Sequence, residues 1–223
     1  MYYLVNKSIS KAGVVPQAEN YPSSKFKYQE FLDWQYSDSG ENPEFGPIVL
    51  ERKANLTDLI GCVVFSLSRC MVVSGKSLDF FSSQSLAENV VFEVSLSKND
   101  RIFSGYSLLK FTEFGTNHID INKTHFYLRN SRTKETKTAD FSIAQIESIL
   151  NQEPKPYKHP WVLVSDKIIL NSNCNLDLFP LSFLVFPFVV SEKFKKEMEK
   201  SDLDIFEFTP LDGKNGNPLV IKI

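Results

Sequence analysis

Three residues in the middle of the chain have the types and spacing of a metal site. His118 and Asp120 lie two positions apart, so on a β-strand their side chains would share one face. His125 follows a turn at Asn122–Lys123 that could bring its ring back beside them. Two histidines and one carboxylate are a ligand set for transition metals. A metal-dependent enzyme is therefore one hypothesis. The commoner alternative is that all three residues face solvent on a half-buried strand.

Other catalytic and cofactor-binding patterns are incomplete or missing. Gly75-Lys76-Ser77 has the residues that end a phosphate-binding loop, but the first glycine of such a loop would fall at Cys70. The chain contains neither the Gly-x-Gly-x-x-Gly nor the Gly-x-Ser-x-Gly pattern. Cys62, Cys70 and Cys174 are odd in number and lack Cys-x-x-Cys spacing, which favours reduced core thiols over disulfides or zinc. We therefore expect no cofactor.

An acidic stretch lies near the start of the chain. The protein has 25 Lys and Arg against 27 Asp and Glu, a net charge of −2, so no basic excess points to nucleic acid or to a membrane. Between Lys27 and Arg52, however, there are six carboxylates, several aromatic residues and no basic residue. This composition is typical of a docking surface for a basic protein. The predicted partner-binding residues are Trp34, Tyr36, Asp38, Glu41 and Glu44. The alternative is a solvated loop with Trp34 in the core.

The elements that position these residues are mostly short strands. Runs rich in β-formers predict strands at Val90–Leu96, Ser107–Phe111, His125–Leu128 and Trp161–Leu170, after a first strand at Met1–Lys7. A helix is indicated over 141–150, where Ser142 and Gln145 have the spacing of a capping box and Phe141 can pack on Ile146. No signal-peptide pattern opens the chain, and no apolar run approaches the ~20 residues of a membrane span, so we expect a cytoplasmic protein.

A short segment recurs at an offset of 117 positions. Val72-Val73-Ser74-Gly75-Lys76 matches Val189-Val190-Ser191-Glu192-Lys193. Each copy follows an Asn-Leu pair, at Asn55 and Asn175, and precedes a similar strand, at Val91–Val94 and Ile205–Phe208. The physical interpretation is a strand that ends at a serine, a short helix capped by that serine, and a returning strand. Phe194 and Met198 would then lie on the buried side of the second helix, and Leu78 and Phe81 on that of the first.

The second copy also carries a family resemblance. Residues 188–198, Phe-Val-Val-Ser-Glu-Lys-Phe-Lys-Lys-Glu-Met, and 203–210, Leu-Asp-Ile-Phe-Glu-Phe-Thr-Pro, resemble the closing segment of a family of immunity proteins from bacterial polymorphic-toxin and contact-dependent inhibition systems. The opening Met1–Leu4 and the stretch from Tyr106 to Asp120 are similar to that family more loosely. The resemblance implies a cytoplasmic protein without catalytic residues that binds and neutralises a cognate toxin. It supplies no fixed set of binding residues, and Gly75 departs from the pattern where the second copy has Glu192.

Together these observations predict an α+β fold of mostly antiparallel short strands with few helices. Two related strand-helix-strand units are expected at 55–94 and 175–208, in an N-terminal half (1–110) and a C-terminal half (111–223) that form one compact unit. The leading functional hypothesis is an immunity protein, not an enzyme, that occludes a cognate protein toxin and binds neither nucleic acid nor membrane. The alternatives are the metal-dependent enzyme of His118, Asp120 and His125, and a structural protein-interaction module.

Overall fold

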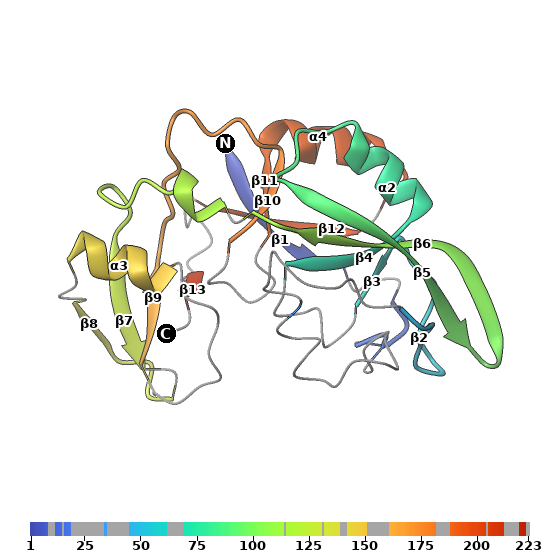
Figure 1. Ribbon diagram of the computed structural model, residues 1–223. Coiled ribbons are helices and arrows are strands. Elements are labelled where there is room, and N and C mark those ends of the chain that lie inside the picture. The colour runs from blue at the N-terminus through green and yellow to red at the C-terminus, as the bar shows by residue number, and fades with distance from the viewer. Residues whose placement is uncertain are drawn as a thin grey trace.

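The computed structural model describes residues 1–8, 12–14, 16–18, 34, 45–61, 69–113, 115–130, 132–138, 142–150, 161–181, 188–203, 205–211 and 219–221. These residues contain three β-sheets and three α-helices, and helices α2 and α4 lie side by side over strands of the first two sheets (Figure 1). Of the pairings between the described strands, all but that of β2 with β5 are antiparallel. The predicted α+β class, with mostly antiparallel short strands and few helices, is confirmed.

The first sheet has the strand order β2-β5-β6-β4-β3. Its strands are β2 (Ile48–Val49), β3 (Leu59–Ile60), β4 (Cys70–Ser74), β5 (Asn89–Lys98) and β6 (Arg101–Phe111). Helix α2 (Gly75–Ser82) follows β4 directly, and the Ser74 Oγ caps it by accepting a hydrogen bond from the Ser77 N–H. β5 and β6 form a long hairpin, and its turn residues Asn99 and Asp100 have φ angles of 49° and 61°, as a tight two-residue turn requires.

The second sheet has the order β10-β11-β1-β12. Its strands are β1 (Tyr2–Lys7), β10 (Leu178–Pro180), β11 (Phe188–Ser191) and β12 (Phe206–Pro210). Helix α4 (Glu192–Lys200) follows β11, and the predicted cap is confirmed because the Ser191 Oγ accepts a hydrogen bond from the Phe194 N–H. Phe194 and Met198 are both buried, as the helical spacing predicts, so α4 packs its apolar side onto the core.

The third sheet lies on the other side of the molecule, with the order β13-β9-β7-β8 (Figure 1). Its elements are β7 (Phe126–Asn130), β8 (Thr136–Thr138), β9 (Trp161–Ser165), β13 (Leu219–Ile221) and helix α3 (Ile143–Leu150). The capping box is confirmed: the Ser142 N–H donates to the Gln145 Oε1 over 2.8 Å, and the Gln145 N–H donates to the Ser142 Oγ over 3.3 Å. Phe141, the predicted packing partner of Ile146, lies outside the described residues.

The first two sheets have equivalent strand registers. Leu59 pairs with Val73 in the first sheet, as Leu178 pairs with Val190 in the second. The capping serines also have matching partners, since Ser74 lies opposite Tyr106 and Ser191 lies opposite Tyr2. β3, β4, α2, β5 and β6 therefore correspond to β10, β11, α4, β12 and β1. The repeated segment that the sequence indicates is a repeated structural unit.

The strand that completes the second unit comes from the opposite end of the chain. In the first unit β6 follows β5 through a hairpin, whereas its counterpart β1 is the first strand of the protein. β1 lies between β11 and β12, with Tyr3 opposite both Val190 and Pro210. A division of the chain at residue 110 therefore separates β1 from the strands that it pairs with.

The register also corrects the predicted match between the returning strands. Val91 pairs with Leu109 and Phe208 pairs with Val5, so Val91 corresponds to Phe208, again at an offset of 117. The sequence comparison had matched Val91 with Ile205, three positions earlier. The offset stays constant because the chain between serine cap and returning strand has the same length in both units.

Two apolar clusters form the core. The larger one joins all three sheets, with Leu109 from the first, Val189 from the second and Leu163 from the third, and it includes the inner sides of α2 and α4. The smaller cluster covers the opposite face of the first sheet, around Leu96 and Leu108. The first sheet is therefore covered on both faces.

Candidate functional site

An aspartate at each strand-to-helix junction holds the capping serine. In the first unit the Ser74 Oγ donates to the Asp58 Oδ1 over 2.7 Å, and the Ser74 N–H donates to the Asp58 carbonyl over 3.0 Å. In the second unit Ser191 makes the same two hydrogen bonds to Asp177, over 2.6 and 3.0 Å. Sequence reasoning missed both aspartates, although an Asp-Leu dipeptide follows each repeated Asn-Leu pair. The two junctions therefore have the same arrangement of serine–aspartate hydrogen bonds.

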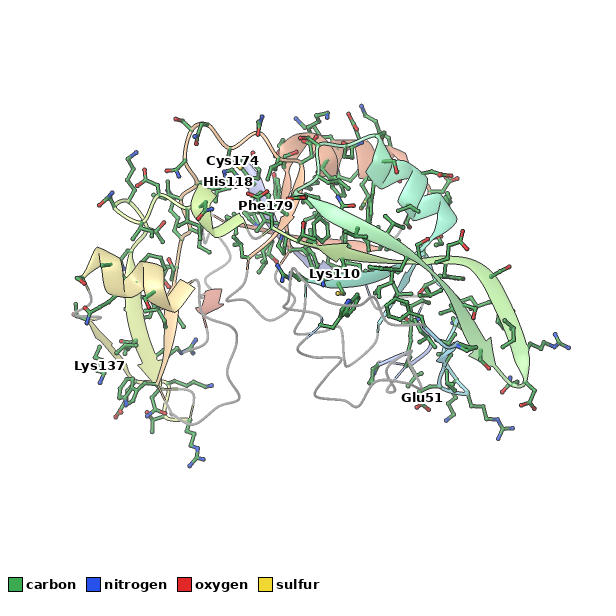
Figure 2. All side chains as sticks on the ribbon, viewed as in Figure 1. Glu51, Lys110, His118, Lys137, Cys174 and Phe179 are labelled. Atoms are coloured by element: carbon green, nitrogen blue, oxygen red, sulfur yellow. The ribbon has the colours of Figure 1, made fainter. Side chains whose placement is uncertain are left out.

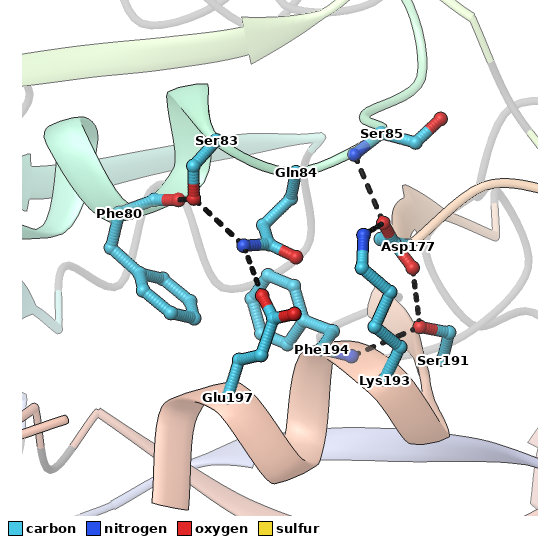
Figure 3. Close-up of polar contacts among 9 residues, drawn as sticks. All are labelled: Phe80, Ser83, Gln84, Ser85, Asp177, Ser191, Lys193, Phe194 and Glu197. Atoms are coloured by element: carbon cyan, nitrogen blue, oxygen red, sulfur yellow. Dashed lines mark hydrogen bonds and ion pairs between the residues drawn. The ribbon is translucent and has the colours of Figure 1, made fainter. Parts of the chain in front are cut away.

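Asp177 has additional partners that connect the two units (Figure 3). Its Oδ2 accepts hydrogen bonds from the Lys193 Nζ over 2.8 Å and from the Ser85 N–H, beyond the end of α2, over 3.1 Å. The Asp177 side chain is only 7% exposed. Burial acts to raise the pKa of this carboxyl, but the hydrogen bonds from Lys193, Ser191 and Ser85 outweigh it, so the pKa is lowered. Asp177 is therefore an ionised structural anchor.

Equivalent tyrosines lie beside the two junctions. The Tyr106 hydroxyl donates to the Thr57 carbonyl over 3.3 Å, and the Tyr2 hydroxyl donates to the Cys174 carbonyl over 2.9 Å. Burial is the main cause that raises the pKa of both hydroxyls, and the charges of Asp58 and Asp177 add to it. Both tyrosines stay protonated at neutral pH and act as hydrogen-bond donors, so neither tyrosine is an activated base or nucleophile.

The geometry of His118, Asp120 and His125 does not support the alternative hypothesis of a metal site. Gly115–His118 form a 3-10 helix instead of a strand, so the two-residue spacing does not align His118 with Asp120. The His118 ring packs against Phe179 at 5.9 Å between centroids (Figure 2), and the His125 ring packs against Tyr127 at 5.9 Å. The Asp120 carboxylate accepts a hydrogen bond from Lys123 over 2.7 Å, and that bond lowers its pKa. The part of the chain that the structure describes includes all three residues and contains no group of three His, Cys, Asp or Glu able to hold a metal ion.

Trp34 lies in the smaller core cluster, as the alternative interpretation of the acidic stretch had it. It is 6% exposed, and its ring lies 5.5 Å from each of the Phe45 and Phe92 rings, centroid to centroid. The Lys110 Nζ donates to the Trp34 carbonyl over 2.7 Å and lies 4.3 Å from the centre of the Trp34 ring. Trp34 is therefore a buried support and not an exposed anchor. The other predicted residues, Tyr36, Asp38, Glu41 and Glu44, lie outside the described residues.

The two residues that flank the acidic stretch in the sequence are described and lie at one place in the fold. Trp34 and Phe45 both pack against Phe92 in the middle of β5. Lys110 also contacts Trp34. Both flanking residues therefore lie next to one strand of the first sheet.

The outer edge of β5 carries exposed apolar side chains that sequence reasoning did not single out. Val90 and Val91 are 43% and 44% exposed. β2 pairs with β5 only at Leu96 and Ser97, so no other described strand lies beyond Asn89–Val94. The order of strands in a sheet is a long-range property, and for this reason the local sequence did not reveal the edge.

Comparisons with known proteins identify no relative, since neither a family model nor a curated protein sequence matches the chain. In the described part of the chain, every helix is too short or too polar to cross a membrane.

Proposed function

We propose that this protein is an immunity protein that binds a cognate bacterial toxin and neutralises it by stoichiometric occlusion, without catalysis. The observation that carries the proposal is that the segment resembling the immunity family is one complete folded unit. Residues 188–198 and 203–210 form β11, α4 and β12, with the cap at Ser191 and the buried Phe194 and Met198 in place. The resemblance thus extends over a whole strand-helix-strand unit.

The composition of the acidic segment suits this function. A toxin complex needs roughly 1,200–2,000 Å² of buried surface and gains association rate from opposite charges. Residues 35–44 carry Asp38, Glu41 and Glu44, and the flanking residues, the buried Trp34 and the half-buried Phe45, pack against each other. A toxin that acts on nucleic acid or on another acidic target has a basic surface, which such a segment would attract.

The test is first to establish whether the open reading frame upstream of this gene encodes a large secreted protein with a variable C-terminal end, and then to produce that C-terminal domain with and without this protein. We expect growth arrest by the domain alone, rescue by co-expression, and a 1:1 complex by calorimetry and light scattering. A domain that neither arrests growth nor binds this protein would contradict the proposal. Binding without arrest would instead support a structural protein-interaction module.

A further inference from the structure

The two related sheets have equivalent edge strands, β5 and β12, which differ in how well they are protected against pairing with another strand. β5 and β12 occupy the same place in their units, and the offset of 117 makes Val90, Val91 and Glu93 the counterparts of Glu207, Phe208 and Pro210. An unprotected edge strand is a template for another strand, and proteins block such edges with proline, charge or covering groups. A comparison of the two edges therefore tests which one can accept a partner.

The hydrogen bonds between neighbouring strands show which way the backbone N–H and C=O groups of β5 and β12 point. The Thr112 N–H donates to the Glu88 carbonyl over 2.8 Å, so Glu88 and Thr112 form a hydrogen-bonded pair. Because such pairs alternate along an antiparallel ladder, the backbone N–H and C=O groups of Val90 and Phe92 point toward β6, and those of Val91 and Glu93 point outward. In the second unit the Leu211 N–H donates to the Tyr2 carbonyl over 3.2 Å. Phe208 and Pro210 are therefore the outward positions of β12.

β12 is protected at all three of its positions, Glu207, Phe208 and Pro210. Pro210 has no N–H to offer, and Glu207 places a charge where β5 has a valine. The Phe208 ring is covered by Tyr3, 6.3 Å away between centroids, and by Lys195, whose Nζ lies 5.8 Å from its centre. In β5 the same three positions carry two exposed valines and a glutamate whose backbone N–H is retained. The first unit therefore lacks the proline and the covering groups, and of these three positions only Glu93 carries a charge.

We propose that the toxin adds a β-strand to the outer edge of β5 between Asn89 and Val94. The inference rests on the proposed function and names the surface that performs it. The outward backbone groups of Asn89, Val91 and Glu93 would bind an extended toxin segment, Val90 and Val91 would pack against its apolar side chains, and Glu93 would pair with a basic one.

Charge identifies the partner as a basic protein and not as a second copy of this chain. Phe92, on the same strand, contacts Trp34 and Phe45 at the two ends of the acidic segment. Two copies joined edge to edge would bring two Glu93 carboxylates to the shared edge, and like charges placed close to each other are unfavourable. A basic toxin strand would instead be attracted by Glu93.

The first experiment examines the free protein by amide hydrogen exchange. We expect the outward amides of Asn89, Val91 and Glu93 to exchange at least about tenfold faster than those of Val90 and Phe92, which donate to β6. Equal protection of both sets would mean that this protein's own chain already covers the edge, and would overturn the inference. A dimer whose formation depends on this edge would overturn it as well.

The second experiment uses Glu93→Pro, which removes one outward N–H. Pro210 shows that the unit accepts proline at this position, so the thermal midpoint should stay within about 3 °C. Binding of the toxin domain should weaken at least about tenfold, since a hydrogen bond is lost and the approaching strand is blocked. Glu93→Thr, which keeps the N–H, should bind within about threefold of wild type.

Val91→Lys is the second variant, because its side chain is already exposed and a positive charge there opposes a basic, apolar strand. It should also weaken binding at least about tenfold. If the toxin domain binds wild type and both edge variants equally well, the proposed edge is wrong while the immunity function stands. If it does not bind wild type at all, the proposed function itself fails.

Discussion

At the scale of single residues, one carboxylate connects the ends of three elements. Asp177 accepts hydrogen bonds from Ser191 at the end of β11, from Lys193 in α4 and from Ser85 after α2. Asp58, its counterpart, binds the serine cap of its own unit. The second junction therefore positions both helices, and the first positions only one.

We expect Asp177→Asn to lower the free energy of unfolding at pH 7 by about 1–3 kcal/mol, because a buried hydrogen-bonded charge is lost. The effect should depend on pH. The pKa of Asp177 is lowered from its ordinary value of 3.8, so its contribution is complete above about pH 4 and disappears as the pH falls through the lowered value. Denaturant unfolding from pH 7 to pH 2 measures both effects.

Asp202→Asn is the matched control for this prediction. Asp202 also pairs with a lysine, Lys76, but its side chain is 95% exposed. Its removal should change the stability by less than about 0.5 kcal/mol at any pH. Equal acid sensitivity of wild type and Asp177→Asn would show that Asp177 is not the group responsible.

The acidic segment leads to a second prediction at this scale. Replacing Asp38, Glu41 and Glu44 together by Asn, Gln and Gln should slow association with the toxin domain and flatten the dependence of that rate on salt. Stopped-flow mixing at several ionic strengths measures both quantities. The control neutralises three carboxylates on and beside the helices, Asp79, Glu199 and Asp202. A similar decrease in both variants would mean that net charge, and not this segment, directs association.

At the scale of elements, α2 and α4 are held together by aromatic side chains. The Phe194 ring lies 5.3 Å from Phe80, 5.8 Å from Phe81 and 6.4 Å from Phe206, between centroids. Phe194 is fully buried and touches both units. The packing of the two helices therefore depends on this one ring more than on the ion pairs along their exposed sides.

Phe194→Ala should lower the free energy of unfolding by about 3–5 kcal/mol, since the cavity would open between the two units. Leu78→Ala, at a half-buried position on α2, should cost clearly less. Thermal and denaturant unfolding measure both variants. A loss below about 1 kcal/mol for Phe194→Ala would show that the helices do not need this contact.

Local signals predicted the elements well. The caps at Ser142 and Ser191 and the buried side of α4 were correct, because capping and helical periodicity depend on residues only three or four positions apart. The alternative hypothesis of a metal site assumed a strand through His118 and Asp120, whereas a 3-10 helix at Gly115–His118 gives the side chains another direction. The free edge of β5 was not predicted, since it depends on which strands meet across the sheet and not on the local sequence.

At the scale of the whole molecule, β1 is an interior strand that lies far in the sequence from both strands it pairs with. It pairs with β11 on one side and with β12 on the other, and Val5 is fully buried. Without β1 both neighbours would lose a ladder of hydrogen bonds and would become unprotected edges.

We expect deletion of residues 1–7 to disrupt the second sheet while the first sheet, which is continuous from β3 to β6, keeps part of its structure. Limited proteolysis followed by mass spectrometry should find new cleavage sites within 188–211 but not within 70–111. Removal of residues 219–221, an edge strand of the third sheet, is the control and should leave 188–211 protected. Unchanged protection of 188–211 after the first deletion would contradict the assigned role of β1.

The position of β1 in the sequence also determines when the second unit can finish folding during translation. Tyr3 and its partner Pro210 are roughly 200 residues apart, so at about 5–20 residues per second their synthesis is separated by at least about ten seconds. The first unit can close as soon as β6 has emerged, whereas the second must hold its central strand unpaired until β12 has been made. Slow translation, or a stop codon before β12, would therefore leave β1 without its partners and its backbone hydrogen-bonding groups exposed.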